Sequence, residues 1–285
     1  MGASSTVTAL RRRRGVFQLS RFAALVTRRE FAAAAQALIA ARALGVTRAA
    51  AEESALMLML YAGYPAALEG LRVLNGAWPG RARRSREGGP ADWVKRGEAL
   101  CSRVYGPSFE KLVPAVHALH PDLARWMIEH GYGRVLSRPG MSARDRELVT
   151  VAALSALGWE RQLVSHLLGA RRVGATLDEV QGALAAGLAR TDAASERIAL
   201  SAWRRLTEAE AAGAAPLGAR ARAGAPARAP GTPPVRRSAR QLARPRARAG
   251  PRSRPAEQSG RNPRPPSRIC KQAHPKDFAR FPPRA

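Results

Sequence analysis

Residues 142–176 constrain the fold of this chain most strongly, because they read as two amphipathic helices joined by a short turn. On the first helix, positions 147, 150, 151 and 154 share a face and read Glu, Thr, Val and Leu. On the second, positions 159, 163, 166, 167, 170 and 173 share a face and read Trp, Leu, His, Leu, Ala and Val. Side chains three and four positions apart lie on one side of a helix. We therefore expect Glu147 and His166 to point inward across the turn at Gly158.

The periodicity leaves two interpretations of this pair. A carboxylate among apolar neighbours is partly removed from water, and within hydrogen-bond reach of an imidazole it would be suited to proton transfer. Alternatively, Glu147 is half exposed and pairs with Arg144 or Arg146, while His166 is a core histidine with satisfied hydrogen bonds.

Helical spacing of apolar residues also runs through residues 17–74 and 93–211, which predicts an all-α protein. Gly45 predicts a helix end and Thr47 the cap of the next helix. The motifs Ser142-x-x-Asp145 and Thr176-x-x-Glu179 predict two further helix starts. Residues 79–92 carry Gly, Pro and like charges without periodicity, which predicts a linker, and residues 1–14 are predicted to be a flexible basic leader.

Much of the formal net charge of +27 lies in residues 212–285. This segment holds 14 of the 21 prolines and 18 Lys and Arg residues, against only Glu257 and Asp277. It has too little apolar surface to offset its chain entropy, so we predict a disordered Arg/Pro-rich tail. The tail is either an out-of-frame extension or a native segment with an anionic partner. It lacks interleaved aromatic residues, so no specific nucleic-acid function is expected.

An internal repeat predicts two domains. Residues 41–47 and 170–176 share the pattern Ala-Arg-x-x-Gly-x-Thr at an offset of 129, each between two helical segments. We therefore expect a first, degenerate repeat at 15–78 and a second domain at 93–211. Ala37 stands where the second repeat has His166, so the first repeat is expected to be structural.

Cysteine and histidine spacing predicts neither a disulfide framework nor a metal site. Cys101 and Cys270 are far apart and outside any Cys-x-x-Cys pattern. His117, His120 and His130 have no paired carboxylate or thiol and are expected at the surface or the edge of the core. No apolar run reaches the roughly 20 residues that span a bilayer, so we expect a cytoplasmic protein without a membrane partner.

The stretch YGRVLSRPGMSARDRELVTVAALSALGWERQLVSHLLGARRVGAT, at 132–176, resembles the carboxymuconolactone decarboxylase family. Members carry an Arg-Pro-Gly lead, an Arg-x-Leu helix start, a His-Leu-Arg segment and a Gly-Val-Thr turn. The resemblance runs from about Gly97 to Leu184, and residues 45–75, with Tyr-Ala-Gly-x-Pro-Ala, are similar to the closing segment of the family. It implies two fused alkylhydroperoxidase-D-like helical domains, usually in a homo-oligomer.

The family has two chemistries, and the resemblance favours one. In the alkylhydroperoxidase-D-like branch, a Glu, a Cys-x-x-Cys and a His form a thiol peroxidase relay. Trp159 and Gln162 hold the thiol positions here, and neither side chain can replace a peroxidatic cysteine. The decarboxylase branch has no such cysteines and needs no metal or organic cofactor. The resemblance thus implies a cofactor-independent decarboxylase acting on a small lactone carboxylate, such as 4-carboxymuconolactone, in aromatic-compound catabolism by the β-ketoadipate pathway.

By this resemblance, His166 would donate a proton or stabilise an oxyanion, and Glu147 would orient it. Arg138 and Arg146 are candidates for the substrate carboxylates, and Trp159 is a third candidate for substrate binding. Decarboxylases usually show His-Leu-Arg, whereas this chain has Leu168 in place of the arginine. Two alternatives therefore stay open: an alkylhydroperoxidase or peroxiredoxin-like protein without the thiol relay, and a non-catalytic helical assembly module.

Overall fold

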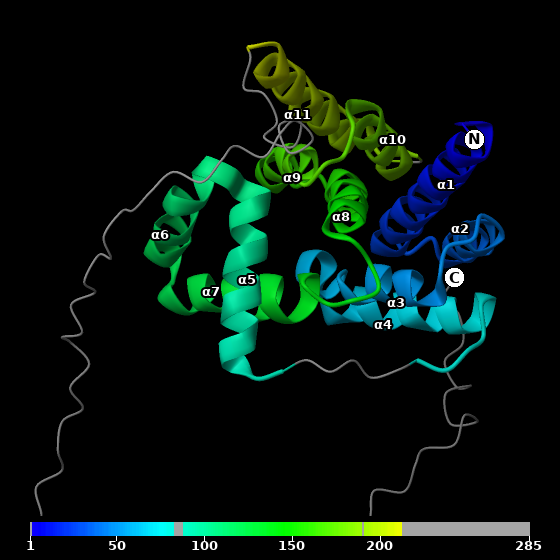
Figure 1. Cartoon of the computed structure of the whole chain (residues 1–285), viewed down its shortest axis with the longest axis horizontal. Coiled ribbons are helices and arrows are strands. Elements are labelled where there is room, and N and C mark those ends of the chain that lie inside the picture. The colour runs from blue at the N-terminus through cyan, green and yellow to red at the C-terminus, as the bar shows by residue number, and fades with distance from the viewer. Residues whose placement is uncertain (1, 83–87, 190, 213–285) are drawn as a thin grey trace, which may run out of the picture. The chain divides into compact units, whose positions relative to one another are not determined.

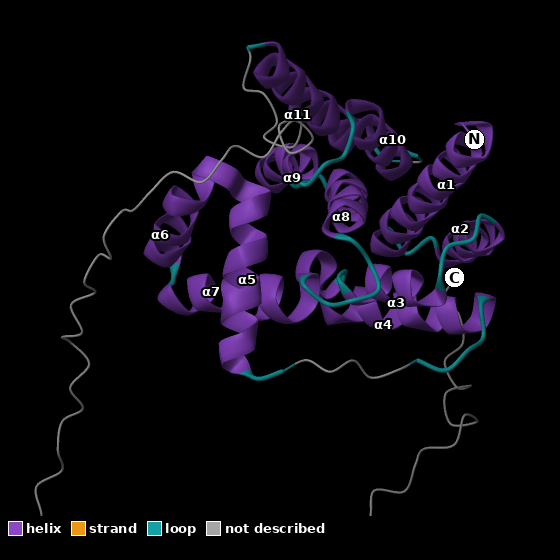
Figure 2. Ribbon diagram, viewed as in Figure 1, coloured by secondary structure: helices purple, strands orange, loops and turns teal. Residues whose placement is uncertain are grey.

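The structure is a computed structural model that describes residues 2–82, 88–189 and 191–212 (Figure 1). Within these ranges every regular element is a helix and there is no strand (Figure 2). The predicted all-α class is confirmed. Residues 213–285, nearly all of the predicted tail, lie outside the described part of the chain.

The helices fall into three consecutive groups, labelled in Figure 1. The first group is α1 (Gly2–Thr27), α2 (Phe31–Ala43), α3 (Arg48–Leu56) and α4 (Met59–Ala77). The second is α5 (Pro90–Tyr105), the 3₁₀ turn η1 (Gly106–Ser108), α6 (Phe109–Leu119), α7 (Pro121–Trp126) and the π-helix η2 (Met127–Leu136). The third is α8 (Ala143–Leu157), α9 (Glu160–Arg172), α10 (Leu177–Leu188) and α11 (Ala193–Ala211).

The helix starts predicted from capping motifs are present. Thr47, Ser142 and Thr176 each accept a hydrogen bond from a backbone N–H three residues later. Such caps satisfy amide groups that have no partner inside the helix. The predicted linker is shorter than expected at its end, because α5 begins at Pro90 with Gly89 as its cap.

The first helix is longer than the sequence predicts. Residues 2–14, expected to form a flexible leader, are part of α1. Arg12 of this segment pairs with Asp145 at 2.9 Å, and Arg13 lies 3.7 Å from Asp178. The structure therefore replaces the predicted leader with helix, because carboxylates distant in sequence oppose the run of arginines.

Buried apolar side chains form two clusters, and both draw on helices from the two predicted repeats. The larger cluster joins side chains such as Phe22 and Leu38 to Val149 of α8. The smaller one joins Val16 of α1 to side chains of α8 to α11. Helix α1 packs directly against α8 and α10. The division into two fused domains is therefore not confirmed and stays a prediction.

Helix positions nonetheless follow the sequence repeat. Helices α2 and α9 begin at Phe31 and Glu160, and α3 and α10 begin at Arg48 and Leu177. Both pairs are separated by the offset of the repeated motif, so the same order of turns and caps recurs in the two halves.

Helix α5 and the π-helix η2 approach each other closely at two glycines. A Cβ atom on Gly133 would lie well inside contact distance of the Trp93 carbonyl oxygen, and one on Gly97 would overlap the Ile128 carbonyl. This contact positions Tyr132 and Arg96, which belong to the sites described below. None of the helices in the described ranges combines the length and apolar character needed to span a membrane.

Candidate active site

Helices α8 and α9 bring Glu147 and His166 together inside the protein. The chain reverses at Gly158, whose left-handed backbone ends α8, and α9 starts two residues later. His166 Nδ1 lies 2.7 Å from Glu147 Oε2, and the two residues are 5% and 2% exposed. The predicted contact is confirmed.

The alternative partners proposed for Glu147 are engaged elsewhere. Arg144 pairs with Glu179, and Arg146 pairs with Glu53. The interpretation of Glu147 as a half-exposed partner of either arginine is therefore wrong.

The Glu147–His166 contact assigns roles to the imidazole nitrogens. An ionised carboxylate only accepts hydrogen bonds, so beside it Nδ1 of His166 donates. Nε2 is then the nitrogen able to exchange a proton with another molecule. A carboxylate that orients an imidazole in this way is a recurrent arrangement in acid–base catalysis.

Three tyrosines surround the pair. The rings of Tyr61 and Tyr105 stand edge-on to His166, with centroids 6.1 Å and 6.3 Å away. The Tyr61 hydroxyl lies 2.9 Å from Thr150 Oγ1, and the Tyr132 ring stands edge-on to that of Tyr105 at 6.2 Å. The imidazole is thus enclosed by aromatic rings that carry hydroxyl groups.

These hydroxyls stay protonated over the ordinary pH range. Burial raises the pKa of Tyr105 to about 12. Burial, reinforced by the nearby Glu147 charge, also raises the pKa of Tyr61. The pKa of Tyr132 is raised chiefly by burial as well. Protonated phenols are hydrogen-bond donors, so they can support negative charge that develops beside His166.

Cys101 of α5 is buried in the same region. Burial, together with the Glu147 charge, raises its pKa to about 12. The thiolate is the nucleophilic form of cysteine, and this environment suppresses it. Cys101 therefore does not supply the missing peroxidatic thiol.

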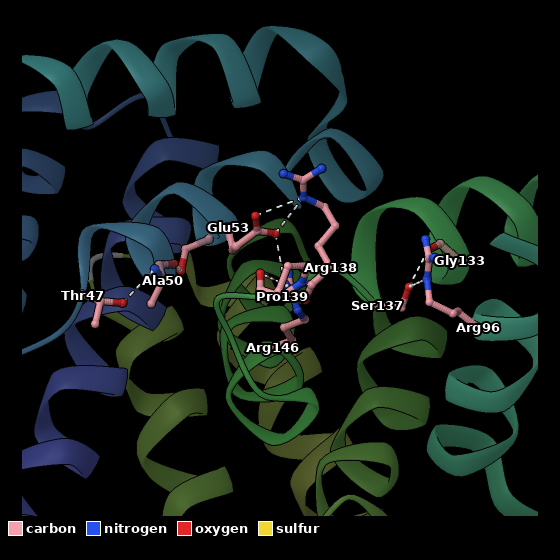
Figure 3. Close-up of polar contacts among 10 residues, drawn as sticks. Thr47, Ala50, Glu53, Arg96, Gly133, Ser137, Arg138, Pro139 and Arg146 are labelled. Atoms are coloured by element: carbon pink, nitrogen blue, oxygen red, sulfur yellow. Dashed lines mark hydrogen bonds and ion pairs between the residues drawn. The ribbon is translucent and has the colours of Figure 1, made fainter. Parts of the chain in front are cut away.

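The two arginines predicted to bind substrate carboxylates converge on a protein carboxylate, Glu53 of α3 (Figure 3). Arg138 Nε lies 3.0 Å from Glu53 Oε1, and Arg146 Nη2 lies 3.0 Å from Glu53 Oε2. Arg146 Nη2 also donates to the Arg138 carbonyl at 2.7 Å. The turn at Gly140, with a φ of 97° that favours glycine, carries the chain from Arg138 to α8.

Arg146 retains unused hydrogen-bonding capacity. It is only 2% exposed, and its Nε and Nη1 atoms are buried without a hydrogen-bond partner among the described residues. Burial is also the main cause that lowers its pKa. Buried guanidinium groups are almost always paired, so these two donors are suited to an anion.

Trp159 and Leu168 occupy different surroundings. Trp159 caps the start of α9 and is 55% exposed, about 10 Å along the helix axis from His166. Its predicted role in substrate binding stays a prediction. Leu168, which replaces the usual arginine, packs against the smaller apolar cluster.

Sequence reasoning missed Glu53, Tyr61 and Tyr105. A glutamate within the Ala-rich face of α3 was the available signal for Glu53, because a carboxylate on such a face needs a buried cationic partner. The tyrosines lie in apolar helices where an aromatic residue ordinarily indicates core. His120 caps α7 and His117 is exposed, in accord with their predicted peripheral positions. The described residues contain no group of three or more potential ligands placed to hold a metal ion.

The fold and the site together define an all-α protein with a buried Glu–His pair held by two adjoining helices. Residues 121–205, which run from α7 into α11 and include both members of the pair, match the model of the carboxymuconolactone decarboxylase family. The family resemblance predicted from the sequence is thus confirmed over this segment.

Two curated relatives are similar to parts of the chain. The 4-carboxymuconolactone decarboxylase of Acinetobacter baylyi is 35% identical over 86 residues, which cover 30% of this chain and 61% of that protein. Peroxisomal protein 2 of Schizosaccharomyces pombe is 29% identical over 126 residues, which cover 42% of this chain and 59% of that protein. The chain spans about three fifths of the length of each relative.

Proposed function

We propose that this protein is a cofactor-independent lyase that removes carbon dioxide from a small lactone carboxylate of the 4-carboxymuconolactone type. The observation that carries the proposal is the buried 2.7 Å contact between His166 and Glu147, within the segment that matches the decarboxylase family. We further propose that it acts in the cytoplasm, in aromatic-compound catabolism, and as a homo-oligomer.

The reaction needs a place for electrons and a source of a proton. The bond between the ring carbon and the carboxylate breaks, and its electron pair moves into the conjugated lactone carbonyl as carbon dioxide leaves. The resulting dienolate takes up a proton at carbon. His166, oriented by Glu147, supplies that proton from Nε2, and the tyrosine hydroxyls donate hydrogen bonds to the enolate oxygen.

Arg146 is suited to hold the substrate carboxylate. Its Nε and Nη1 donors are buried and have no partner among the described residues. The Arg146 charge also lowers the pKa of Tyr61, while the Glu147 charge raises it, so both groups act on the same tyrosine. A substrate between Arg146 and His166 would satisfy the two donors and place its reacting carbon near the imidazole.

The pair lies beneath a cover of side chains. His166 is only 5% exposed, and the rings of Tyr61 and Tyr105 stand over it. Access for a substrate therefore requires these rings to move, and their return would exclude water from the dienolate.

The test is turnover of 4-carboxymuconolactone by the full chain, followed as loss of the ultraviolet absorbance of the lactone. We expect wild-type turnover and a fall of at least about 100-fold in kcat/KM for His166→Ala, a magnitude typical of a lost acid–base group. His117→Ala, at an exposed histidine of α6, is the matched control and should retain the wild-type rate.

The two parts of the proposal fail separately. Absence of turnover by the wild-type protein would refute the substrate. Turnover that survives His166→Ala unchanged would refute the site while leaving the substrate in place.

A second candidate function is a non-catalytic helical assembly module. The near-complete burial of His166 favours it, because a structural histidine also satisfies its hydrogen bonds in the core. This candidate predicts a stable oligomer by light scattering, no lactone turnover, and the same oligomer in the His166→Gln variant.

A further inference from the structure

A second cavity, away from the Glu147–His166 pair, is strongly cationic. It has a volume of about 310 Å³ and lies between α5, the end of η2 and the start of α8. Three arginines line it, Arg96, Arg103 and Arg138, and no Asp or Glu is among its described lining residues. The larger cavity beside α1 differs, since its Arg12 is neutralised by Asp145.

Two of the three guanidinium groups are held in place by the protein. Arg96 Nε donates to Ser137 Oγ at 3.0 Å, and its Nη2 donates to the Gly133 carbonyl at 3.3 Å (Figure 3). Arg138 is held through Nε by Glu53. Fixed guanidinium groups lose little side-chain entropy when they bind an anion. Arg103 is exposed at the margin of the cavity.

The backbone adds positive potential to that of the side chains. Ala143, the first residue of the 15-residue helix α8, contributes to the lining. The amino-terminal end of a helix carries a partial positive charge that favours anions. Three arginines and a helix terminus thus act on one small space.

The rest of the lining is apolar. Leu100 and Leu136 are buried, and Met141 and Ala143 are half-buried. An inorganic phosphate would use the cations but leave this surface without a partner. A ligand with an anionic head and a compact hydrocarbon body would use both, and the cavity volume is at the lower end of the about 300–1,000 Å³ typical of small-molecule sites.

We propose that this cavity is a binding site for a small organic carboxylate with an apolar body. The carboxylate lies among Arg96, Arg103 and Arg138, and the hydrocarbon contacts Leu100 and Met141. The site does not depend on decarboxylation, because neither Glu147 nor His166 lines the cavity.

The experiment uses the full chain with methyl-¹³C methionine, observed by NMR at low ionic strength. Met141 lines the cavity, whereas Met57 is fully buried in the larger apolar cluster and serves as an internal reference. Titration with benzoate should shift the Met141 methyl resonance saturably and leave Met57 unchanged. Benzamide, the neutral analogue, and inorganic phosphate should produce no saturable shift at the same concentrations.

Variants connect the shift to the arginines. Arg103→Ala removes an exposed side chain and should weaken the apparent Kd for benzoate about three-fold. The double variant Arg96→Ala, Arg103→Ala should weaken it at least about ten-fold. Arg204→Ala, an equal charge change at an exposed position of α11, should leave the Kd unchanged.

Three results would overturn the proposal. The first is a Met141 resonance that does not respond to benzoate. The second is an equal response to benzamide or phosphate, which would mean that the cavity does not select an apolar carboxylate. The third is an equal loss of affinity in Arg204→Ala and Arg103→Ala, which would assign binding to the overall charge of the chain.

Discussion

His166 Nδ1 and Glu147 Oε2 make a 2.7 Å contact in which both side chains are almost completely removed from water. A pair in this position is sensitive to the loss of either partner, because the remaining polar group cannot recover its hydrogen bonds from solvent. The same burial that suits the pair to proton transfer therefore makes it a determinant of stability.

Glu147→Ala should lower the free energy of unfolding by about 3 kcal/mol, because it leaves the buried imidazole without a partner. Urea denaturation followed by circular dichroism measures the change. Glu69→Ala breaks the exposed pair with Arg72 and should change stability by less than about 1 kcal/mol. Equal effects of the two substitutions would contradict the buried role of Glu147.

The Arg138–Glu53–Arg146 network predicts an order of effects. Glu53→Gln leaves two guanidinium groups facing each other and should destabilise the protein by about 3 kcal/mol. Arg138→Met leaves Glu53 paired with Arg146 and should cost less. Midpoints of urea unfolding give the comparison, and a larger loss in Arg138→Met would show that the two arginines do not share one carboxylate.

The contact between α5 and η2 predicts a difference between two neighbouring glycines. Gly133→Ala places a methyl group against the Trp93 carbonyl and should destabilise the protein by about 2 kcal/mol. At Gly131, in the same π-helix, the nearest atom to an added Cβ is 3.9 Å away. Gly131→Ala should therefore be near neutral in thermal unfolding, and a comparable loss there would argue against close helix packing at Gly133.

Cys101 should be unreactive in the folded protein. Its pKa is raised to about 12, so the thiol is neutral at pH 8 and is also buried. In a Cys270→Ser variant, mass spectrometry should detect little alkylation of Cys101 by iodoacetamide at pH 8, and complete alkylation after denaturation. Rapid alkylation of the native protein would instead indicate an accessible thiolate and would reopen the peroxidase hypothesis.

Asp192 should contribute a specific dependence of stability on acid. Its carboxylate caps α11 by accepting a 2.8 Å hydrogen bond from the backbone N–H of Ser195, and this bond lowers its pKa. The folded pKa lies below the unfolded value of about 3.9, so the contribution is complete above that value and is lost as pH falls through the folded pKa. Asp192→Asn keeps a capping side chain but should remove this part of the decline in Tm below about pH 4. An unchanged pH profile would contradict the assignment.

The sequence by itself determined the all-α class and the facing positions of Glu147 and His166. Both follow from local rules: the helical period sets which side chains share a face, and Gly158 permits the reversal that joins α8 to α9. The caps at Thr47, Ser142 and Thr176 follow from equally local chemistry, since each side chain reaches an amide three residues away.

Only the tertiary structure decided what surrounds the pair. Tyr61 meets Thr150 across 89 residues of sequence, and Glu53 meets Arg146 across 93. Residues 2–14 form helix rather than a flexible leader, and Arg12 pairs with Asp145, 133 positions away. Periodicity identifies which face of a helix is buried, but the partner of a buried charge depends on how the helices pack, and that packing brought Glu53 to Arg138 and Arg146.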